Sequence, residues 1–506
     1  MTDSLLRTPH SCPVASPRST THRRPGSLPL EEHSVPALFG LALIGAFCLL
    51  GMAIRRWIPA FRTNMVPAFV IAGFLGMTAM NIGLDGLLPG VDAGLFTTIT
   101  AQMFTLSFIS IGLTPAPPRA SDDSGQGGGL LRGAWTMGLT WTLVFALQAL
   151  LGIGLVAVAG PAVGMDPVYG LMLPFAFAQG PGQAVTFAGI FETQGWGDAT
   201  AVGLAFAAAG FAAAFLVGVP LARWGMRRGL ATHSVPISDS VAKGFYRNDE
   251  ETDSMGRETS YAGNIDTLTV HVALMGIAYV LAHGIAWVLS FIPGFFGDTI
   301  SGMMFMNGLL AAYFVRWAMR RARIEHLIDR RLQTKITGFA TDYVVVASFL
   351  AVQLAVVVQW LFPILLTILV ATVVTAAATI LIGQRYGSDH DFERTLGMYG
   401  TLTGTTPTGL ALVRIVDPRS RTTTMAEMGL MNLPEMLYLP AMLTISAAFA
   451  GTYGLGAAVG ILAALTVGYA AIMLVTRGVG RRRTWTLRGD DLASTDGAEA
   501  AVPVTD

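Results

Sequence analysis

The chain has 506 residues, of which 53% are hydrophobic and only 13% are charged. Soluble domains carry about 25% charged residues, so this composition excludes an ordinary soluble domain and predicts a polytopic, all-α membrane protein. The 32 basic and 32 acidic side chains give a formal net charge of zero, a balance that points to no nucleic-acid partner.

The chain opens with a polar tail and then a series of apolar segments. Residues 1–35 are rich in proline, serine and arginine, and we expect this tail to be disordered. A membrane-spanning helix needs about 20 apolar residues. By that criterion the first four predicted helices are 36–54, 65–84, 95–113 and 134–160.

The next apolar segment, 168–192, is interrupted at its centre. It contains PFAFAQGPGQAVTFAGIF, in which the Gly-Pro-Gly run at 180–182 forbids a continuous helix and lets the backbone approach a ligand. Such backbone is tolerated at membrane depth only inside protein or beside a water-filled cavity. We therefore predict a re-entrant segment whose candidate substrate-binding residues are Gln179, Gly180, Gly182, Gln183 and Thr186.

A fifth predicted helix, 199–222, is followed by a polar linker, 223–264, that divides the chain into two halves. The second half begins with apolar segments at 268–292 and 300–316. The basic amphipathic stretch 317–335 is expected to lie on the membrane surface. Residues 343–384 contain no charge and are roughly twice as long as one bilayer crossing requires. They predict two helices, 338–360 and 361–383, that turn near Pro363.

A second interrupted segment, 392–416, contains LGMYGTLTGTTPTGLALV. Freed carbonyls and hydroxyls at its centre are oxygen ligands that suit sodium, and half-helix N-termini facing the gap favour a carboxylate. Predicted helices at 430–450 and 453–475 and a polar, disordered tail at 477–506 follow. The candidate residues are Thr403, Gly404 and Thr405 for the ion, and Thr406, Pro407 and Thr408 for the substrate.

Arg414 follows this second tip by six residues, on the arm that leaves it. An arginine at membrane depth costs about 3 kcal/mol on insertion scales, so its side chain must face protein, water or ligand. Two interpretations remain open. Its planar fork can bind a substrate carboxylate, or it reaches the cytoplasmic surface beside Asp417 as a solvated pair.

Each half therefore contains four predicted helices, one interrupted segment and a fifth helix, which gives about 11 transmembrane helices with the extra helix at 451–476. An odd number of spans per half places the second half in the opposite orientation, as an inverted five-plus-five repeat of 36–222 and 265–450. Lysine and arginine are expected in cytoplasmic loops. Apart from Arg23 and Arg24 in the tail, they follow this rule, because none occurs in 85–94, 161–167, 192–198, 293–299 or 451–452. The two interrupted segments then enter from opposite sides and meet near the midplane.

Three stretches carry a resemblance to the bacterial glutamate:sodium symporter family. GTTPTGL at 404–410 resembles the family's second re-entrant motif, G-A-T-P-T-A-I, and 195–223 and FISIGL at 108–113 are similar to two of its helices. The likeness covers about 36–450. It implies re-entrant hairpins in a mobile, elevator-type transport domain, a separate scaffold and a homodimer in the cell membrane of a bacterium. It also implies sodium-driven uptake of glutamate or a related amino acid, with the sodium ion as the coupling ion and no other cofactor.

The chain departs from the family pattern at both tips. The family's first loop reads G-G-H-G-T, whereas this chain has Pro181 in the place of the histidine. After the T-P-T motif the family has an asparagine and a glutamine, where this chain has Leu412 and Arg414. These changes fall at the site that the resemblance implies, and they concern the solute and not the mechanism class.

Two alternatives accompany this interpretation. One is a proton-coupled carboxylate transporter with Glu435 or Asp342 as the proton carrier, since carboxylates inside membranes are functional candidates. The other is an ion channel built on paired re-entrant loops, which would need a continuous lined pore. The sequence has no Walker A motif, metal-ligand cluster or nucleophile elbow, so no enzyme is expected. Asn81 and Asn307, at the ends of corresponding helices, are expected to hydrogen-bond between helices.

Overall fold

The computed structural model describes residues 36–487 except 64, 89, 116–125, 234–242, 247, 249–253, 389, 419–420 and 481. The predicted N-terminal tail lies outside the described residues. Within the described part the protein is helical and has no strand. Eight described helices are long and apolar enough to cross a membrane: Pro36–Trp57, Ala68–Leu87, Ala93–Leu113, Gly129–Ala159, Ala199–Arg227, Thr267–Leu289, Leu361–Gly383 and Leu455–Val475. The prediction of a polytopic, all-α membrane protein is confirmed.

The helices of the first half lie where the sequence predicts them. They are α1 (Pro36–Trp57), the short connector α2 (Pro59–Thr63), α3 (Ala68–Ala79) with its π-helical continuation η1 (Met80–Leu84) and α4 (Asp85–Leu87), α5 (Ala93–Leu113) and α6 (Gln126–Ala159). Asp92 caps α5, because its carboxylate accepts a hydrogen bond from the Leu95 amide at 2.8 Å.

Both predicted interruptions are helix breaks. After η2 (Pro161–Val163), the first hairpin consists of η3 (Pro167–Met172), α7 (Leu173–Phe177) and α8 (Pro181–Glu192), and α9 (Ala199–Arg227) follows it. The second hairpin consists of α17 (Asp391–Leu402) and α18 (Thr406–Val416). Pro181 and Pro407 each stand in the first turn of the returning helix, where a missing amide proton costs no helical hydrogen bond.

The stretch 317–335, which is expected to lie on the membrane surface, is not one helix. The second half begins with α11 (Thr267–Leu289), α12 (Phe295–Gly302), α13 (Met304–Arg321), η4 (Glu325–Leu327) and α14 (Arg330–Leu350). The amphipathic stretch is therefore divided between the end of α13 and the start of α14. Arg320 donates two hydrogen bonds to Glu325 at 3.0 Å across the turn, and Asp329 accepts one from the Leu332 amide to cap α14. Two helix ends that face water produce the same mixture of basic and apolar residues as one helix lying on a membrane surface.

The turn predicted near Pro363 lies earlier. The chain breaks at 351–353, before α15 (Leu354–Gln359) and α16 (Leu361–Gly383). The Asn81 amide donates to the Val352 carbonyl at 2.9 Å, and its oxygen accepts from the Leu354 amide at 2.9 Å. This confirms the interhelical role predicted for Asn81. Pro363 falls in the first turn of α16, where proline is tolerated.

The helix predicted at 430–450 is also not continuous. It is divided into α19 (Thr424–Leu430), α20 (Asn432–Glu435), η5 (Met436–Tyr438) and α21 (Leu439–Phe449), before α22 (Leu455–Val475). Pro434 lies at this break and packs on α6, where a Cβ added to Gly138 would lie 2.5 Å from Cγ of Pro434. We call residues 431–438 the α20 break.

Part of the predicted disordered C-terminal tail is packed. Thr484 donates a hydrogen bond to Asp391 at 2.7 Å, and the Trp485 ring lies 5.3 Å from that of Phe392, centroid to centroid. Trp485 is 4% exposed. Residues 482–487 therefore cover the base of the second hairpin, and 488–506 lie outside the described residues.

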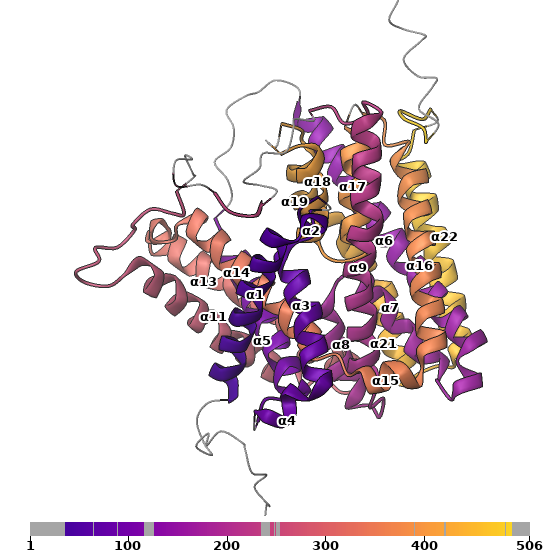
Figure 1. The fold of residues 1–506 in the computed structure, drawn as a ribbon, viewed down its shortest axis with the longest axis horizontal. Helices are drawn as coiled ribbons and strands as arrows, with labels where there is room; N and C mark the ends of the chain where they lie inside the picture. The colour runs from indigo at the N-terminus through magenta and orange to yellow at the C-terminus, as the bar shows by residue number, and fades with distance from the viewer. Residues whose placement is uncertain are drawn as a thin grey trace, which may run out of the picture.

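The helices form two bundles in contact (Figure 1). The first bundle contains α1, α3, α5, α11, α13 and α14, in which α5 runs along α14. The second bundle contains α6, the two hairpins, α9, α16 and α19–α22. Helix α8 of the first hairpin packs against α5 and α14 and joins the bundles. Figure 1 shows α17 and α18 toward one end of the molecule and α7 and α8 toward the other, so the hairpins approach the centre from opposite ends.

Candidate functional site

The tips of the two hairpins touch. A Cβ added to Gly180 would overlap Cγ2 of Thr405 and would lie 3.0 Å from the Gly404 carbonyl oxygen. Gly180 also has a φ of 80° and a ψ of −176°, a conformation that only glycine adopts readily. Both the close approach and the backbone conformation therefore require glycine here.

A cavity of about 370 Å³ lies at this junction, within the size range of small-molecule sites. The first tip contributes Gln179, Pro181, Gly182 and Gln183, and the second contributes Thr405, Thr406 and Pro407. Helices α5, α13 and α14 of the other bundle and the α20 break complete the lining. We call this space the central cavity.

Two glutamines of the first tip have unused acceptors at this cavity. Gln179 and Gln183 are each 8% exposed, and their side-chain carbonyl oxygens are buried without a hydrogen-bond partner among the described residues. An unsatisfied buried acceptor costs about 1–3 kcal/mol. A bound solute that carries hydrogen-bond donors can recover that cost, so these oxygens are candidate ligands.

The rest of the lining is largely aromatic. The rings of Phe104, Phe108 and Phe305 lie 4.9 to 5.3 Å apart, centroid to centroid. A Cβ on Gly182 would overlap the Phe104 ring, so the first tip lies directly against α5. Trp141 on α6 and Tyr438 at the end of the α20 break form a further edge-to-face pair at 5.3 Å. An apolar cavity with few polar groups is typical of ligand sites.

Of the residues predicted to bind the ion, Thr403 and Gly404 are buried behind the second tip, whereas Thr405 is half-buried and lines the central cavity. Thr403 is fully buried, and its hydroxyl donates to the Tyr399 carbonyl at 2.7 Å. The hydroxyl oxygens of Thr405 and Thr408 are 3.1 Å apart. A Cβ on Gly210 of α9 would lie 2.6 Å from the Thr403 carbonyl oxygen, so α9 packs tightly on this tip.

Gln148 of α6 is a buried polar residue near the second tip that the sequence analysis missed. Its amide donates to the Leu402 carbonyl at 2.9 Å and to the Thr375 hydroxyl at 3.1 Å. Its own carbonyl oxygen is buried without a partner in the described part of the chain. The sequence signal that could have identified Gln148 was a single glutamine within the apolar segment 134–160.

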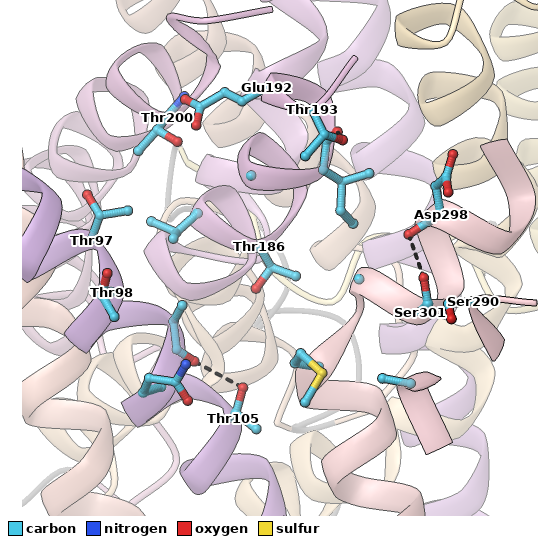
Figure 2. Close-up of a pocket in the computed structure, with 18 of the residues that line it drawn as sticks. Thr97, Thr98, Thr105, Thr186, Glu192, Thr193, Thr200, Ser290, Asp298 and Ser301 are labelled. Carbon is cyan, nitrogen blue, oxygen red and sulfur yellow. Dashed lines mark hydrogen bonds between the residues drawn. The ribbon is translucent and has the colours of Figure 1, made fainter. Parts of the chain in front are cut away.

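Thr186, a predicted substrate residue, does not line the central cavity. Its hydroxyl donates to the Gly182 carbonyl at 2.8 Å, and its side chain lines a second cavity of about 710 Å³ between α5, α8, α11 and α12. Figure 2 shows Thr186 between the threonines of α5 and the end of α12 that carries Asp298 and Ser301. We call this space the outer cavity, because it adjoins 192–198 and 293–299, which contain no basic residue and which the sequence predicts to face outward.

Helices α5 and α8 form the wall between the two cavities. On α5, Phe104 lines the central cavity and its neighbour Thr105 lines the outer one. On α8, Gln183 lines the central cavity and Val185 lines the outer one. A shift of α8 along α5 would therefore change which cavity the first tip faces.

Arg414 lies outside both cavities. Its side chain is exposed on α18, which favours the interpretation of a surface residue over that of a ligand. Asp417 is buried and accepts hydrogen bonds from the amides of Thr422 and Arg421 at 2.8 and 2.9 Å. Burial alone would raise the pKa of Asp417, but these bonds and one from the Thr422 hydroxyl hold the pKa below its ordinary value. Asp417 therefore caps the loop after α18.

The two carboxylates considered as proton carriers lie in different places. Glu435 lines the central cavity from the α20 break. Asp342 is exposed on α14 and lines neither cavity. The residues brought together at the central cavity are thus the two tips and Glu435.

Known proteins resemble this chain across most of its length. Residues 34–420 match the model of a family described as sodium/glutamate symporter. The sodium/glutamate symporter of Escherichia coli K12 is 22% identical over 375 residues, which cover 73% of this chain and 86% of that protein. The sodium/glutamate symporter of Shigella flexneri matches with the same identity and coverage. The family match includes both hairpins.

Proposed function

The chain belongs to the sodium/glutamate symporter family, and on that basis we propose that it couples the entry of sodium to the uptake of glutamate or a closely related amino acid. The family resemblance seen in the GTTPTGL motif is confirmed by the match over 34–420. The protein is a transporter of the bacterial cell membrane and not an enzyme.

The meeting of the two tips at a common cavity is the observation that supports this function. Helices α8 and α18 both begin at the cavity, and helix N-termini favour a substrate carboxylate. Gln179 and Gln183 supply acceptors, while Thr406 and Pro407 form the second side of the site. Thr403, Gly404 and Thr405 supply hydroxyl and carbonyl oxygens for sodium, the kind of ligand that broken transporter helices use.

The two bundles have different roles in the proposed transport cycle. The second bundle carries both hairpins and would move as the transport domain of an elevator-type transporter. The first bundle would form the scaffold, and α1, α3, α11 and α13 would supply the contact of a homodimer, as the family resemblance implies. The inverted repeat explains why one hairpin would open toward each side of the membrane.

The arrangement corresponds to a state that faces the cytoplasm. Thr337 and Thr341, which line the central cavity, lie in the first half and just past the middle of α14, whose N-terminal end is basic. On the other side, Phe104 lies against Gly182 and separates this cavity from the outer one. We place the substrate between the tips in this state.

Uptake by the purified protein in liposomes tests the function. We expect labelled glutamate or a related amino acid to accumulate when sodium is higher outside, and not when an equal potassium gradient replaces it. Accumulation that ignores sodium and follows an imposed pH gradient would favour the proton-coupled alternative. A conductance without any solute gradient, measured in planar bilayers, would favour the channel.

A further inference from the structure

We propose that Glu435 binds the ammonium group of the amino-acid substrate and sets the selectivity between amino acids with one and with two carboxylates. This inference rests on the proposed function and adds the group that the two tips do not supply. It is carried by the position of Glu435 at the central cavity, the charge of that cavity and the break that brings the residue there.

The first observation is the helix break itself. The corresponding helix of the first half, α9, runs continuously from Ala199 to Arg227, whereas its counterpart is interrupted at the α20 break. Gly138 of α6 permits this geometry, because a Cβ there would lie 2.8 Å from the Met431 carbonyl oxygen and 2.5 Å from Cγ of Pro434. The break places Asn432 and Glu435 in the lining of the central cavity.

The second observation is charge. Among the described residues that line the central cavity, Glu435 is the one charged side chain, and no arginine, lysine or histidine accompanies it. One of its carboxylate oxygens, Oε2, is buried without a hydrogen-bond partner among the described residues. A desolvated carboxylate needs a cation or several donors to be stable. The described lining supplies no cation, so the ligand is the natural source.

The third observation is the match to a zwitterion. The N-termini of α8 and α18 favour the substrate carboxylate, and Glu435 favours a cation in the same cavity. An α-amino acid carries both charges on one carbon. Trp141 and Tyr438 line the cavity with Glu435, and aromatic rings of this kind can also attract a cation. Of the candidate sodium ligands, Thr403 and Gly404 do not line this cavity, whereas Thr405 lines it from the second tip, so the ion and the ammonium group would share only the Thr405 side of the cavity.

Selectivity follows from the same charge. A second carboxylate on the substrate enters a cavity that already contains Glu435 and is repelled by it, whereas an uncharged side chain is not. Glutamate and glutamine have nearly the same shape and differ in this charge alone. Glutarate is glutamate without its amino group, so it carries the repelled charges and lacks the attracted one.

The test compares Glu435→Gln with wild-type protein in sodium-driven liposome assays. We expect KM for glutamine to rise at least tenfold with a smaller change in kcat, because the ammonium partner is lost. Inhibition by glutarate should strengthen at least threefold in the same variant, because the repulsion is lost. Glu435→Asp should restore part of the affinity for glutamine. The matched control is Glu325→Gln, an identical substitution in the turn between α13 and α14, which should leave all three values within twofold.

Each other outcome overturns the inference. Parallel weakening of glutamine binding and of glutarate inhibition would indicate a structural role for Glu435. Unchanged amino-acid affinity with loss of the pH dependence of uptake would indicate that Glu435 is a proton carrier. Loss of sodium dependence alone would indicate that Glu435 is an ion ligand. Failure of wild-type protein to accumulate or bind any amino acid with sodium would instead refute the proposed function, before the variant is considered.

Discussion

At the residue scale, Gly180 is the position where substitution has the clearest expected effect. Gly180→Ala introduces a Cβ that overlaps Thr405 and occupies a backbone conformation that costs a non-glycine residue about 1–3 kcal/mol. We expect sodium-driven uptake to fall at least tenfold while expression and size-exclusion profile stay normal. The control is Gly189→Ala on α8, where a Cβ meets nothing within 4 Å. Equal activity of the two variants would show that the tips need not touch during transport.

Arg414 gives a second residue-scale prediction. Its exposed position outside the cavities predicts that Arg414→Lys changes the apparent KM for substrate by less than twofold, since the charge still reaches water. Kinetics of uptake in liposomes provide the measurement. A strong rise in KM at unchanged protein assembly would restore the alternative in which the guanidinium fork binds a carboxylate.

The residues that the two tips contribute to the central cavity could largely be predicted, because helix-breaking residues at membrane depth are tolerated only beside protein or a water-filled cavity. The tip residues Gln179, Gln183 and Thr406 were found in this way. Thr186, also predicted to bind substrate, lines the outer cavity and not the central one, because its part of α8 faces α5, α11 and α12. Gln148 was missed, because one amide within an apolar helix has no pattern that identifies its partner.

At the element scale, the second hairpin is tied to α19 by a buried ion pair. The Arg394 guanidinium donates to both carboxylate oxygens of Glu427, at 2.7 and 2.5 Å, and both residues are at most 6% exposed. Removing one member of a buried pair costs about 3–5 kcal/mol. We expect Glu427→Gln to lower the stability of the folded protein by roughly 2–4 kcal/mol, since Asp391 still faces Arg394 at 3.3 Å.

The measurement is the midpoint temperature of thermal unfolding in detergent, monitored as the loss of monodisperse protein. Glu325→Gln is the matched control. It breaks a pair with the exposed Arg320, and such solvent-screened pairs contribute little to stability. A midpoint that falls equally in both variants would mean that the buried pair adds nothing specific to the hairpin base.

The helix breaks that the sequence analysis missed have a common cause. The breaks at 351–353 and 431–438 lie within apolar sequence and are stabilised from other helices, by Asn81 in one case and by packing against Gly138 in the other. Hydropathy cannot show such tertiary partners. Pro363 was a misleading signal, because the first turn of a helix accepts proline without a break.

At the scale of the whole molecule, the arginine distribution predicts the orientation. We expect Met255→Cys, in the linker, to face the cytoplasm and Phe296→Cys, in the first turn of α12, to face outward; both positions are exposed. In a background without Cys12 and Cys48, a membrane-impermeant maleimide should label Phe296→Cys in intact cells. Met255→Cys should react only after permeabilisation. Labelling of both in intact cells would contradict the inverted repeat.

The last prediction concerns movement of one bundle against the other. Ile190 lies on α8 of the second bundle and Gly302 on α12, which also packs on α11 of the first bundle, and a Cβ on Gly302 would lie 2.6 Å from Cγ1 of Ile190. Ile190→Cys combined with Gly302→Cys removes that overlap and brings two thiols within reach of one another. If the hairpin bundle slides during transport, oxidation of this pair should reduce uptake at least tenfold, and a reductant should restore it.

A cross-link within one bundle distinguishes this movement from general damage by oxidation. Gly73 on α3 and Phe349 on α14 belong to the same bundle, and a Cβ on Gly73 would lie 3.1 Å from the Phe349 Cβ. The pair Gly73→Cys and Phe349→Cys should form a disulfide that leaves uptake within threefold of the reduced protein. The decisive result is that the disulfide in the Ile190 and Gly302 pair alone blocks uptake and retains sodium-dependent binding of substrate. Because α8 carries the first tip, this result would mean that the tip must leave α12 to complete the cycle. Full uptake with that disulfide formed would exclude a sliding bundle and require the tips alone to open.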